Sequence, residues 1–160
     1  MITCLLCFLA LSQPYYPHQH AVGPEQYNVC HAIAGEAVRQ SVDPFVVVAI
    51  GFVESRYRWE DKPNRRGAMG PLQVLPRYHC PGGRRAGCDY IEAGVDAYRL
   101  CLSRWPDEPL CHYNSGEKCY PCSRHYARTV TLRADRLRRD YRAAIDGVRE
   151  MILWVFNWEG

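Results

Sequence analysis

Glu54 is the residue of this 160-residue chain whose surroundings best suit acid–base chemistry. It follows an apolar stretch, residues 45–53, that carries no charged side chain. Burial at the end of such a stretch disfavours the charged carboxylate, and the negative end of a helix dipole disfavours it further. Both effects raise the pKa toward the range where a carboxylic acid can donate a proton near neutral pH. A salt bridge with Arg56 or Arg58 is the simpler alternative role for Glu54.

A buried helix over residues 43–55 is the element expected to position Glu54. Asp43 is a suitable N-cap, and Pro44 suits the first helical position. A helix that is apolar on all sides is buried inside a protein instead of lying on its surface. The three β-branched residues 46–48 leave a strand as the alternative, but the Asp-Pro start and the length favour the helix.

Three further segments have the apolar spacing of helices. They cover residues 25–40, residues 89–104 with Asp89 as the N-cap, and a long segment from Ser123 onward. The long segment repeats its apolar residues almost as a heptad, and its final apolar run, residues 151–156, suits docking on a partner or a membrane interface. Its arginines indicate a solvated face and not a nucleic-acid footprint. Pro71 is expected to start a short helix that ends before Pro76.

Length and composition indicate one globular domain. Hydrophobic residues make up 48% and charged residues 23%, and the net charge of +3 would help the chain approach an anionic polymer without identifying it. Residues 1–11 form an apolar run that is too short to span a bilayer. This run is either the core of a cleaved signal peptide or a retained terminus that packs on a partner or inserts in a membrane. Residues 12–24, with three prolines, indicate an extended linker.

The nine cysteines favour disulfides and an oxidising compartment. Two lie in the apolar leader, and the odd number among the other seven leaves at least one thiol unpaired unless it bonds outside the chain. Cys80 and Cys88 can close a small loop, and another bridge can form among Cys111, Cys119 and Cys122. The alternative is zinc, but no standard finger has the spacing of the residues concerned, which are His79, Cys80, Cys88, Cys111, His112, Cys119 and Cys122. We therefore expect no metal and no cofactor.

Two motifs follow Glu54-Ser55 in the chain, and they carry a resemblance to a known family. They are Gly67-Ala68-Met69-Gly70-Pro71-Leu72-Gln73 and His112-Tyr113-Asn114-Ser115-Gly116, with Tyr126 further on. In this order they resemble the soluble-type lytic transglycosylases of the goose-type lysozyme-like superfamily. That family has Glu-Ser at the end of a buried helix, then Gly-Ala-x-Gly-Leu-Met-Gln, then Ala-Tyr-Asn-x-Gly. This chain departs from it at Pro71, Leu72 and His112, and the resemblance covers about residues 25–130.

The resemblance implies a mainly α, lysozyme-like single domain at residues 25–130. The leader and linker, residues 1–24, precede it, and a C-terminal helical extension, residues 131–160, follows. It also implies an enzyme that cleaves the β-1,4 bond between N-acetylmuramic acid and N-acetylglucosamine without water, leaving 1,6-anhydro ends. Glu54 would be the one catalytic residue, first as acid and then as base. The implied substrate-binding residues are Ser55, Met69, Gln73, Tyr113, Asn114 and Tyr126.

Two other functions stay open on the same fold. A hydrolytic muramidase would need a second carboxylate, for which Glu60, Asp61 and Asp89 are available outside any recognisable motif. A structural or wall-binding protein of a larger assembly would need no turnover at all. For Tyr113 the alternative role is core packing, and for Asn114 it is a turn before Gly116.

The expected partner is the glycan strand of peptidoglycan, and nucleic acid is not expected. The N-terminal apolar segment and the C-terminal helix would serve contacts with other proteins or with a second copy. The place of action would be the bacterial cell wall or periplasm. The chain would reach it either by export with an N-terminal signal or as a component of a virion.

Overall fold

The computed structural model describes residues 2–12, 23–59 and 61–157, with side chains as far as Met151. Most of the predicted linker, residues 13–22, lies outside the described residues. In chain order the helices are α1 (Ile2–Ser12), α2 (Pro24–Arg39), α3 (Pro44–Ser55), α4 (Pro76–His79), the 3-10 helix η1 (Pro81–Gly83), α5 (Tyr90–Arg104), α6 (Pro109–Ser115) and α7 (Pro121–Asn157). Within the described residues there is no strand, and one isolated bridge joins Met69 to Val74. The predicted mainly α single domain with a long C-terminal helix is confirmed.

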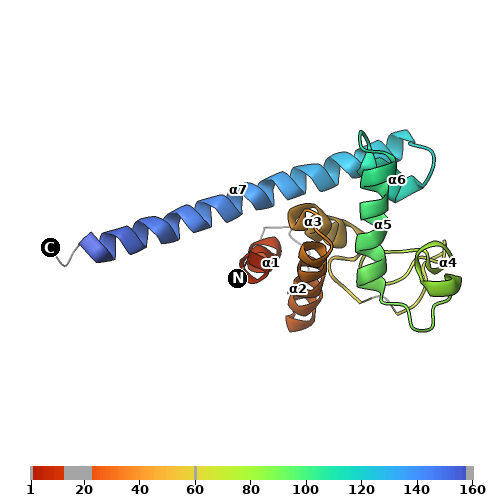
Figure 1. Cartoon of the computed structure of the whole chain (residues 1–160), viewed down its shortest axis with the longest axis horizontal. Coiled ribbons are helices and arrows are strands. Elements are labelled where there is room, and N and C mark those ends of the chain that lie inside the picture. The colour runs from red at the N-terminus through yellow and green to blue at the C-terminus, as the bar shows by residue number, and fades with distance from the viewer. Residues whose placement is uncertain (1, 13–22, 60, 158–160) are drawn as a thin grey trace.

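α3 is the buried centre of the domain. The Asp43 side chain accepts a hydrogen bond of 2.9 Å from the Phe45 N–H, and Pro44 is the first helical residue. The residues from Val47 to Phe52 are all buried. α2 and α7 pack on α3 from different sides, and α1 also contacts it (Figure 1). The predicted helix is therefore correct, and the alternative strand is wrong.

α1 contributes to the same core. Its Leu6, Cys7 and Ala10 are buried, and Cys7 forms a disulfide with Cys30 of α2. From α7, the Arg133 guanidinium donates a hydrogen bond of 3.1 Å to the Ala10 carbonyl oxygen. Of the described helices, none is both long and apolar enough to cross a membrane.

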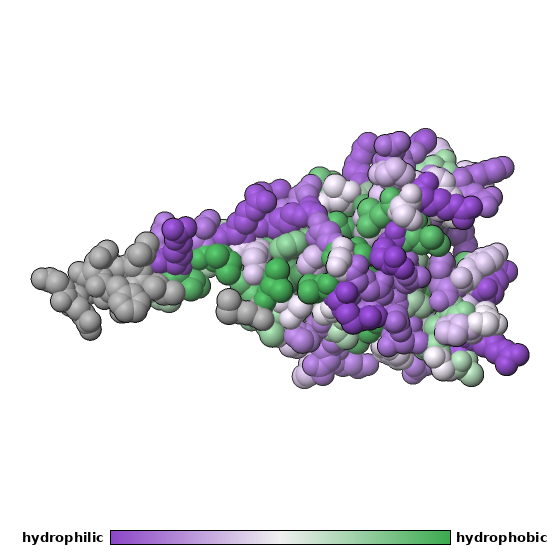
Figure 2. Space-filling model, in the orientation of Figure 1, coloured by the Kyte–Doolittle hydropathy of each residue, from purple (hydrophilic) through white to green (hydrophobic). Residues whose placement is uncertain are grey.

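α7 starts inside the domain and leaves it after about half of its 37 residues (Figure 1). The first part is anchored by three fully buried side chains, Val130, Ala134 and Leu137. The Tyr141 ring then meets the Phe45 ring edge-on at 5.5 Å between centroids. Beyond this contact the helix exposes Ile145, Val148 and Met151. Figure 2 shows green, apolar surface along this projecting part of the molecule.

Two further disulfides close short loops. Cys80–Cys88 confirms the predicted pair, and Cys111–Cys119 is the bridge formed among the three cysteines expected to supply one. The free thiols of the described residues are Cys4, Cys101 and Cys122. The Cys80–Cys88 disulfide closes the segment between α4 and α5. The Cys111–Cys119 disulfide joins α6 to the loop before α7.

Candidate active site

Glu54 lies one residue before the end of α3 and is half-buried. The helix ends because Arg56 adopts a left-handed conformation, with φ 57°, and its N–H bonds the Phe52 carbonyl oxygen at 2.9 Å. Tyr57 is also left-handed, with φ 60°. Two such residues in succession reverse the chain sharply, so the residues after Glu54 turn back onto α3.

The Tyr57 ring stabilises this reversal of the chain after α3. It is fully buried, and its hydroxyl donates a hydrogen bond of 3.0 Å to the Val48 carbonyl oxygen. The ring packs against Gly51, where an added Cβ would stand 3.3 Å from the ring and 2.8 Å from Ile33. Gly51 thus gives the space that the ring needs, and the C-terminal end of α3 is held rigidly.

Burial raises the pKa of the Glu54 carboxyl to about 7, and the Tyr126 hydroxyl opposes part of this rise. A salt bridge with an arginine would lower this pKa, so the observed direction favours the acid–base role. The Tyr126 hydroxyl, on α7, is buried and has no partner of good hydrogen-bond geometry in the described structure. We therefore take its interaction with the carboxyl as a loose contact that a bound ligand can tighten.

Tyr113 of α6 completes the group around the carboxyl. Burial, and after it the charge of Glu54, raises the pKa of the Tyr113 hydroxyl and that of the Tyr126 hydroxyl well above their usual range. Both hydroxyls are therefore proton donors and not anions at physiological pH. We call Glu54, Tyr113 and Tyr126 the carboxyl–tyrosine cluster. It joins α3, α6 and α7.

The glycine-containing segment forms a tight turn instead of the predicted short helix from Pro71. Met69 and Val74 exchange backbone hydrogen bonds of 2.8 and 3.0 Å across it. Gly70 and Gln73 have φ values of 71° and 49°, which a right-handed helix does not allow. A Cβ on Gly70 would also fall 2.5 Å from the Tyr90 Cβ, so only glycine fits at this position.

Two side-chain hydroxyls hold this turn beside Glu54. The Ser55 Oγ donates a hydrogen bond of 2.8 Å to the Pro71 carbonyl oxygen, and the Tyr113 hydroxyl donates one of 2.7 Å to the Leu72 carbonyl oxygen. Pro71 and Leu72 are both fully buried. These two bonds bring the end of α3, the turn and α6 together, so the three motifs that are separate in sequence meet at one place.

The other predicted site residues have different surroundings. Met69 is buried, and its sulfur accepts a hydrogen bond of 3.3 Å from the Tyr90 hydroxyl. The Gln73 side chain donates to the Gly70 carbonyl oxygen at 3.0 Å and accepts from the Asn64 amide at 2.9 Å, so it stabilises the turn. Asn114 is exposed on α6. The structure thus gathers Ser55, Tyr113 and Tyr126 around Glu54 and gives Met69 and Gln73 structural contacts.

Asn64 is a positioning residue that the sequence analysis misses. Its Oδ1 accepts hydrogen bonds from the backbone N–H groups of Arg66 (2.8 Å) and Ala68 (3.1 Å), and its amide holds Gln73. An asparagine three residues before a glycine is a signal for such a side-chain-closed turn. The Asn64 side chain therefore links the loop after α3 to the turn beside Glu54.

Within the described residues, no second carboxylate takes part in setting the pKa of Glu54, whose determinants are burial and Tyr126. Asp61 is exposed. Asp89 is used as the N-cap of α5 and accepts from the Ile91 and Glu92 N–H groups at 2.9 and 3.0 Å. Glu60, the third carboxylate that the sequence offers, lies outside the described residues.

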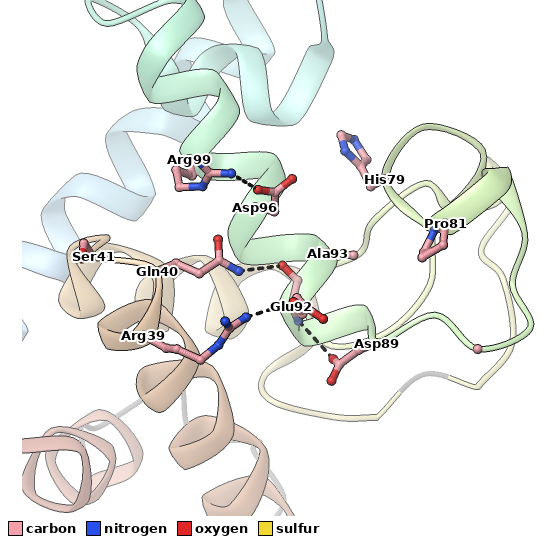
Figure 3. A pocket seen from close by; sticks show the side chains of 11 residues that line it. Arg39, Gln40, Ser41, His79, Pro81, Asp89, Glu92, Ala93, Asp96 and Arg99 are labelled. Atoms are coloured by element: carbon pink, nitrogen blue, oxygen red, sulfur yellow. Dashed lines mark hydrogen bonds and ion pairs between the residues drawn. The ribbon is translucent and has the colours of Figure 1, made fainter.

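A separate cavity of about 580 Å³ lies near the N-terminal end of α3. It is bounded by the end of α2, by α5 and by the Cys80–Cys88 loop (Figure 3). Its charges largely pair with each other: Arg39 with Glu92 at 2.9 Å, and Arg99 with Asp96. Ser41, which lines it, precedes α3, and a 12-residue helix is about 18 Å long. The cavity and Glu54 therefore lie at opposite ends of α3.

The site near Glu54 offers one group that can both give and take a proton near neutral pH, with two neutral phenol hydroxyls beside it. The buried turn, held by Ser55 and Tyr113, fixes the backbone next to this group. No protein-family model matches the chain, and no curated protein and no solved structure matches it either.

Proposed function

We propose that the chain is a peptidoglycan lytic transglycosylase. It would cleave the β-1,4 bond between N-acetylmuramic acid and N-acetylglucosamine without water and leave 1,6-anhydro-muramic ends. The observation that carries the proposal is the half-buried Glu54 at the end of α3 with the Tyr113 and Tyr126 hydroxyls beside it, surroundings that raise the pKa of the carboxyl to about 7. A single group that alternates between acid and base suits a reaction in which the substrate supplies its own nucleophile.

The proposed reaction starts from protonated Glu54. The carboxyl gives its proton to the glycosidic oxygen, and the bond from that oxygen to C1 of the muramic residue breaks. The 6-hydroxyl oxygen of the same residue then bonds to C1, and its proton passes to the Glu54 carboxylate. Glu54 ends protonated as it began, so the glycosidic bond at C1 is exchanged for an internal acetal bond at the same carbon, without net uptake of water.

The neighbouring residues have supporting roles in this proposal. The Tyr126 hydroxyl, buried without a well-formed bond, is suited to donate to Glu54 in its anionic stage or to the sugar. Ser55 and Tyr113 position the turn that forms the wall of the site. Asn114, exposed on α6, suits the N-acetyl and hydroxyl groups of a bound glycan. Met69 and Gln73 would contribute by stabilising the turn beside Glu54.

The place of action belongs to the proposal as well. It is the bacterial cell wall or periplasm, reached by export or as a virion component. The projecting part of α7, with Ile145, Val148 and Met151 exposed, would serve contacts with other proteins of a particle or secretion apparatus. Nucleic acid is not proposed as a partner.

Digestion of purified peptidoglycan followed by mass spectrometry tests the proposed reaction. The expected products carry 1,6-anhydro ends and are lighter by one water than the hydrolytic products of the same glycan length. Reducing muramic ends would indicate the hydrolytic muramidase instead. Wall binding without any cleavage, by wild type and Glu54→Gln alike, would indicate the structural or wall-binding protein.

A further inference from the structure

A second group of side chains that can bind a metal ion lies on one face of α6, apart from the carboxyl–tyrosine cluster. Glu108 directly precedes α6, His112 lies one helical turn later, and Cys119 follows in the loop before α7. One ligand-type atom from each of the three lies within 4.8 Å of those of the other two. Residues four apart share one face of a helix, which brings Glu108 and His112 together. The loop then returns Cys119 to this face.

The His112 ring is already oriented as a metal-binding imidazole is. Its Nδ1 lies 2.7 Å from the Gly116 carbonyl oxygen, and because that oxygen can only accept, Nδ1 carries the proton. Nε2 is then left with its lone pair. Metal-ligating histidines commonly donate their other N–H to a backbone carbonyl in this way. The ring also stacks on Trp105 at 4.4 Å between centroids, which limits its rotation.

Cysteine sulfur supplies the remaining donors. Cys119 is bonded to Cys111, so reduction of this one disulfide releases two thiols next to His112 and Glu108. Two thiolates, one imidazole and one carboxylate are a donor set that tetrahedral Zn²⁺ accepts. The Arg124 guanidinium, 2.9 Å from a Glu108 oxygen, would offset the negative charge of such a site.

We propose that the reduced chain binds one Zn²⁺ through Cys111, His112, Cys119 and Glu108, and that disulfide formation excludes the metal. In the reducing step, two molecules of a small thiol give two electrons and two protons to the Cys111–Cys119 bond and leave as one disulfide. Zn²⁺ binding then displaces the two cysteine protons. The chain would thus hold α6 to the loop before α7 either through a bound metal ion or through the disulfide.

Cys122 provides a matched control at the start of α7, three residues after Cys119. It forms a Cys-x-x-Cys sequence with Cys119 but is exposed, unpaired and outside the group of three, and its sulfur lies 4.0 Å from the Ser123 Oγ. Cys88 provides a second control, because its disulfide with Cys80 is also opened by reduction but lies elsewhere.

The test is a zinc titration of the full chain after reduction with a phosphine, followed by removal of free metal and counting of zinc per chain. One zinc per chain is expected for wild type, Cys122→Ser and Cys88→Ser, and an affinity at least about tenfold lower for Cys119→Ser and Glu108→Gln. Cobalt in place of zinc should give the visible spectrum of a tetrahedral site with thiolate charge-transfer bands. Circular dichroism checks that each variant is folded.

Three results would overturn the proposal. They are full zinc binding by Cys119→Ser, equal loss in Cys122→Ser, and the same affinity in the oxidised wild type as in the reduced one. Because the readout is metal content and not wall cleavage, failure here leaves the proposed enzymatic function standing. Absence of cleavage would likewise leave the zinc site standing.

Discussion

The Tyr113 hydroxyl donates a hydrogen bond of 2.7 Å to the carbonyl oxygen of Leu72, 41 residues earlier in the chain. The preceding carbonyl, that of Pro71, accepts a bond from Ser55 in the same manner. Two helices thus hold two successive carbonyl groups of one buried turn. The position of the turn relative to Glu54 depends on these two hydroxyls, which gives them a measurable share in stability and, in the proposed function, in activity.

Tyr113→Phe and Ser55→Ala should each destabilise the fold by about 1–3 kcal/mol, because each leaves a buried carbonyl without its donor. Urea unfolding measures this. Ser103→Ala is the control: its Oγ donates to the Leu100 carbonyl oxygen on the exposed side of α5, and its removal should change stability by less than about 0.5 kcal/mol. A Tyr113→Phe protein as stable as wild type would show that the bond contributes nothing.

Glu54→Gln should lower the rate of wall cleavage by about 10²- to 10⁴-fold, because glutamine cannot transfer the proton. Release of soluble fragments from labelled peptidoglycan measures the rate. Glu25→Gln, on the exposed side of α2, should keep wild-type activity. An active, folded Glu54→Gln enzyme would remove Glu54 from the mechanism.

The raised pKa of Glu54 also predicts how stability depends on pH. The folded protein holds the Glu54 proton up to about pH 7, whereas the unfolded chain loses it near the ordinary value of 4.5. Between these two values the folded state binds more protons, so stability falls as the pH rises through this window. The loss is at most about 3.5 kcal/mol, since the folded and unfolded pKa values differ by about 2.5 and one pKa unit corresponds to about 1.4 kcal/mol.

Glu54→Gln is the direct check on this titration, because it removes the ionisable group while keeping the shape of the side chain. The variant should lose this part of the pH dependence and should be more stable than wild type above pH 7. Thermal unfolding of both proteins between pH 4 and pH 8 compares the two curves. If the stability of wild type and of Glu54→Gln changed with pH in the same way, the raised pKa would not belong to Glu54.

Tyr126→Phe should move the alkaline side of the pH–activity profile to higher pH. The Tyr126 hydroxyl lowers the pKa of Glu54, so its removal should keep the carboxyl protonated to a higher pH. Stability should change little, since the hydroxyl has no well-formed hydrogen bond to lose. Tyr141→Phe, at the ring contact with Phe45, is the control and should leave the profile in place.

Gly94→Ala should destabilise the fold and disturb the turn. A Cβ at this position of α5 would lie 2.5 Å from the Leu72 Cβ, so the turn or the helix must move, at a cost of about 1–3 kcal/mol. Gly147→Ala in α7 is the matched change in open space and should stabilise the helix by about 0.5–1 kcal/mol. Equal effects of the two substitutions would contradict this packing of Leu72.

The sequence is most informative where local chemistry decides the structure. Asp43 and Asp89 mark the starts of α3 and α5, because a carboxylate that accepts from the first helical N–H groups is a local signal. The short loop between Cys80 and Cys88 also makes their pairing predictable. In the candidate site, the desolvation of Glu54 follows from its place at the end of an apolar helix.

Long-range contacts are what the sequence leaves undetermined. Nothing in residues 1–12 indicates that Cys7 pairs with Cys30, since that pairing depends on how α1 lies against α2. Pro71 is compatible with a helix start, but the left-handed Gly70 and Gln73 make a tight turn instead. The position of Tyr126 is expected only through the family resemblance, because no local pattern links α7 to Glu54.

The 37 residues of α7 make one unbroken rod with the candidate site near its beginning. From Tyr126 to Met151 the axis rises by about 38 Å, at 1.5 Å per residue. In the proposed function, a partner that binds the exposed part of α7 would therefore be held at a fixed distance from the glycan at the candidate site. Shortening or lengthening α7 by whole turns would change this distance and leave the residues around Glu54 unchanged.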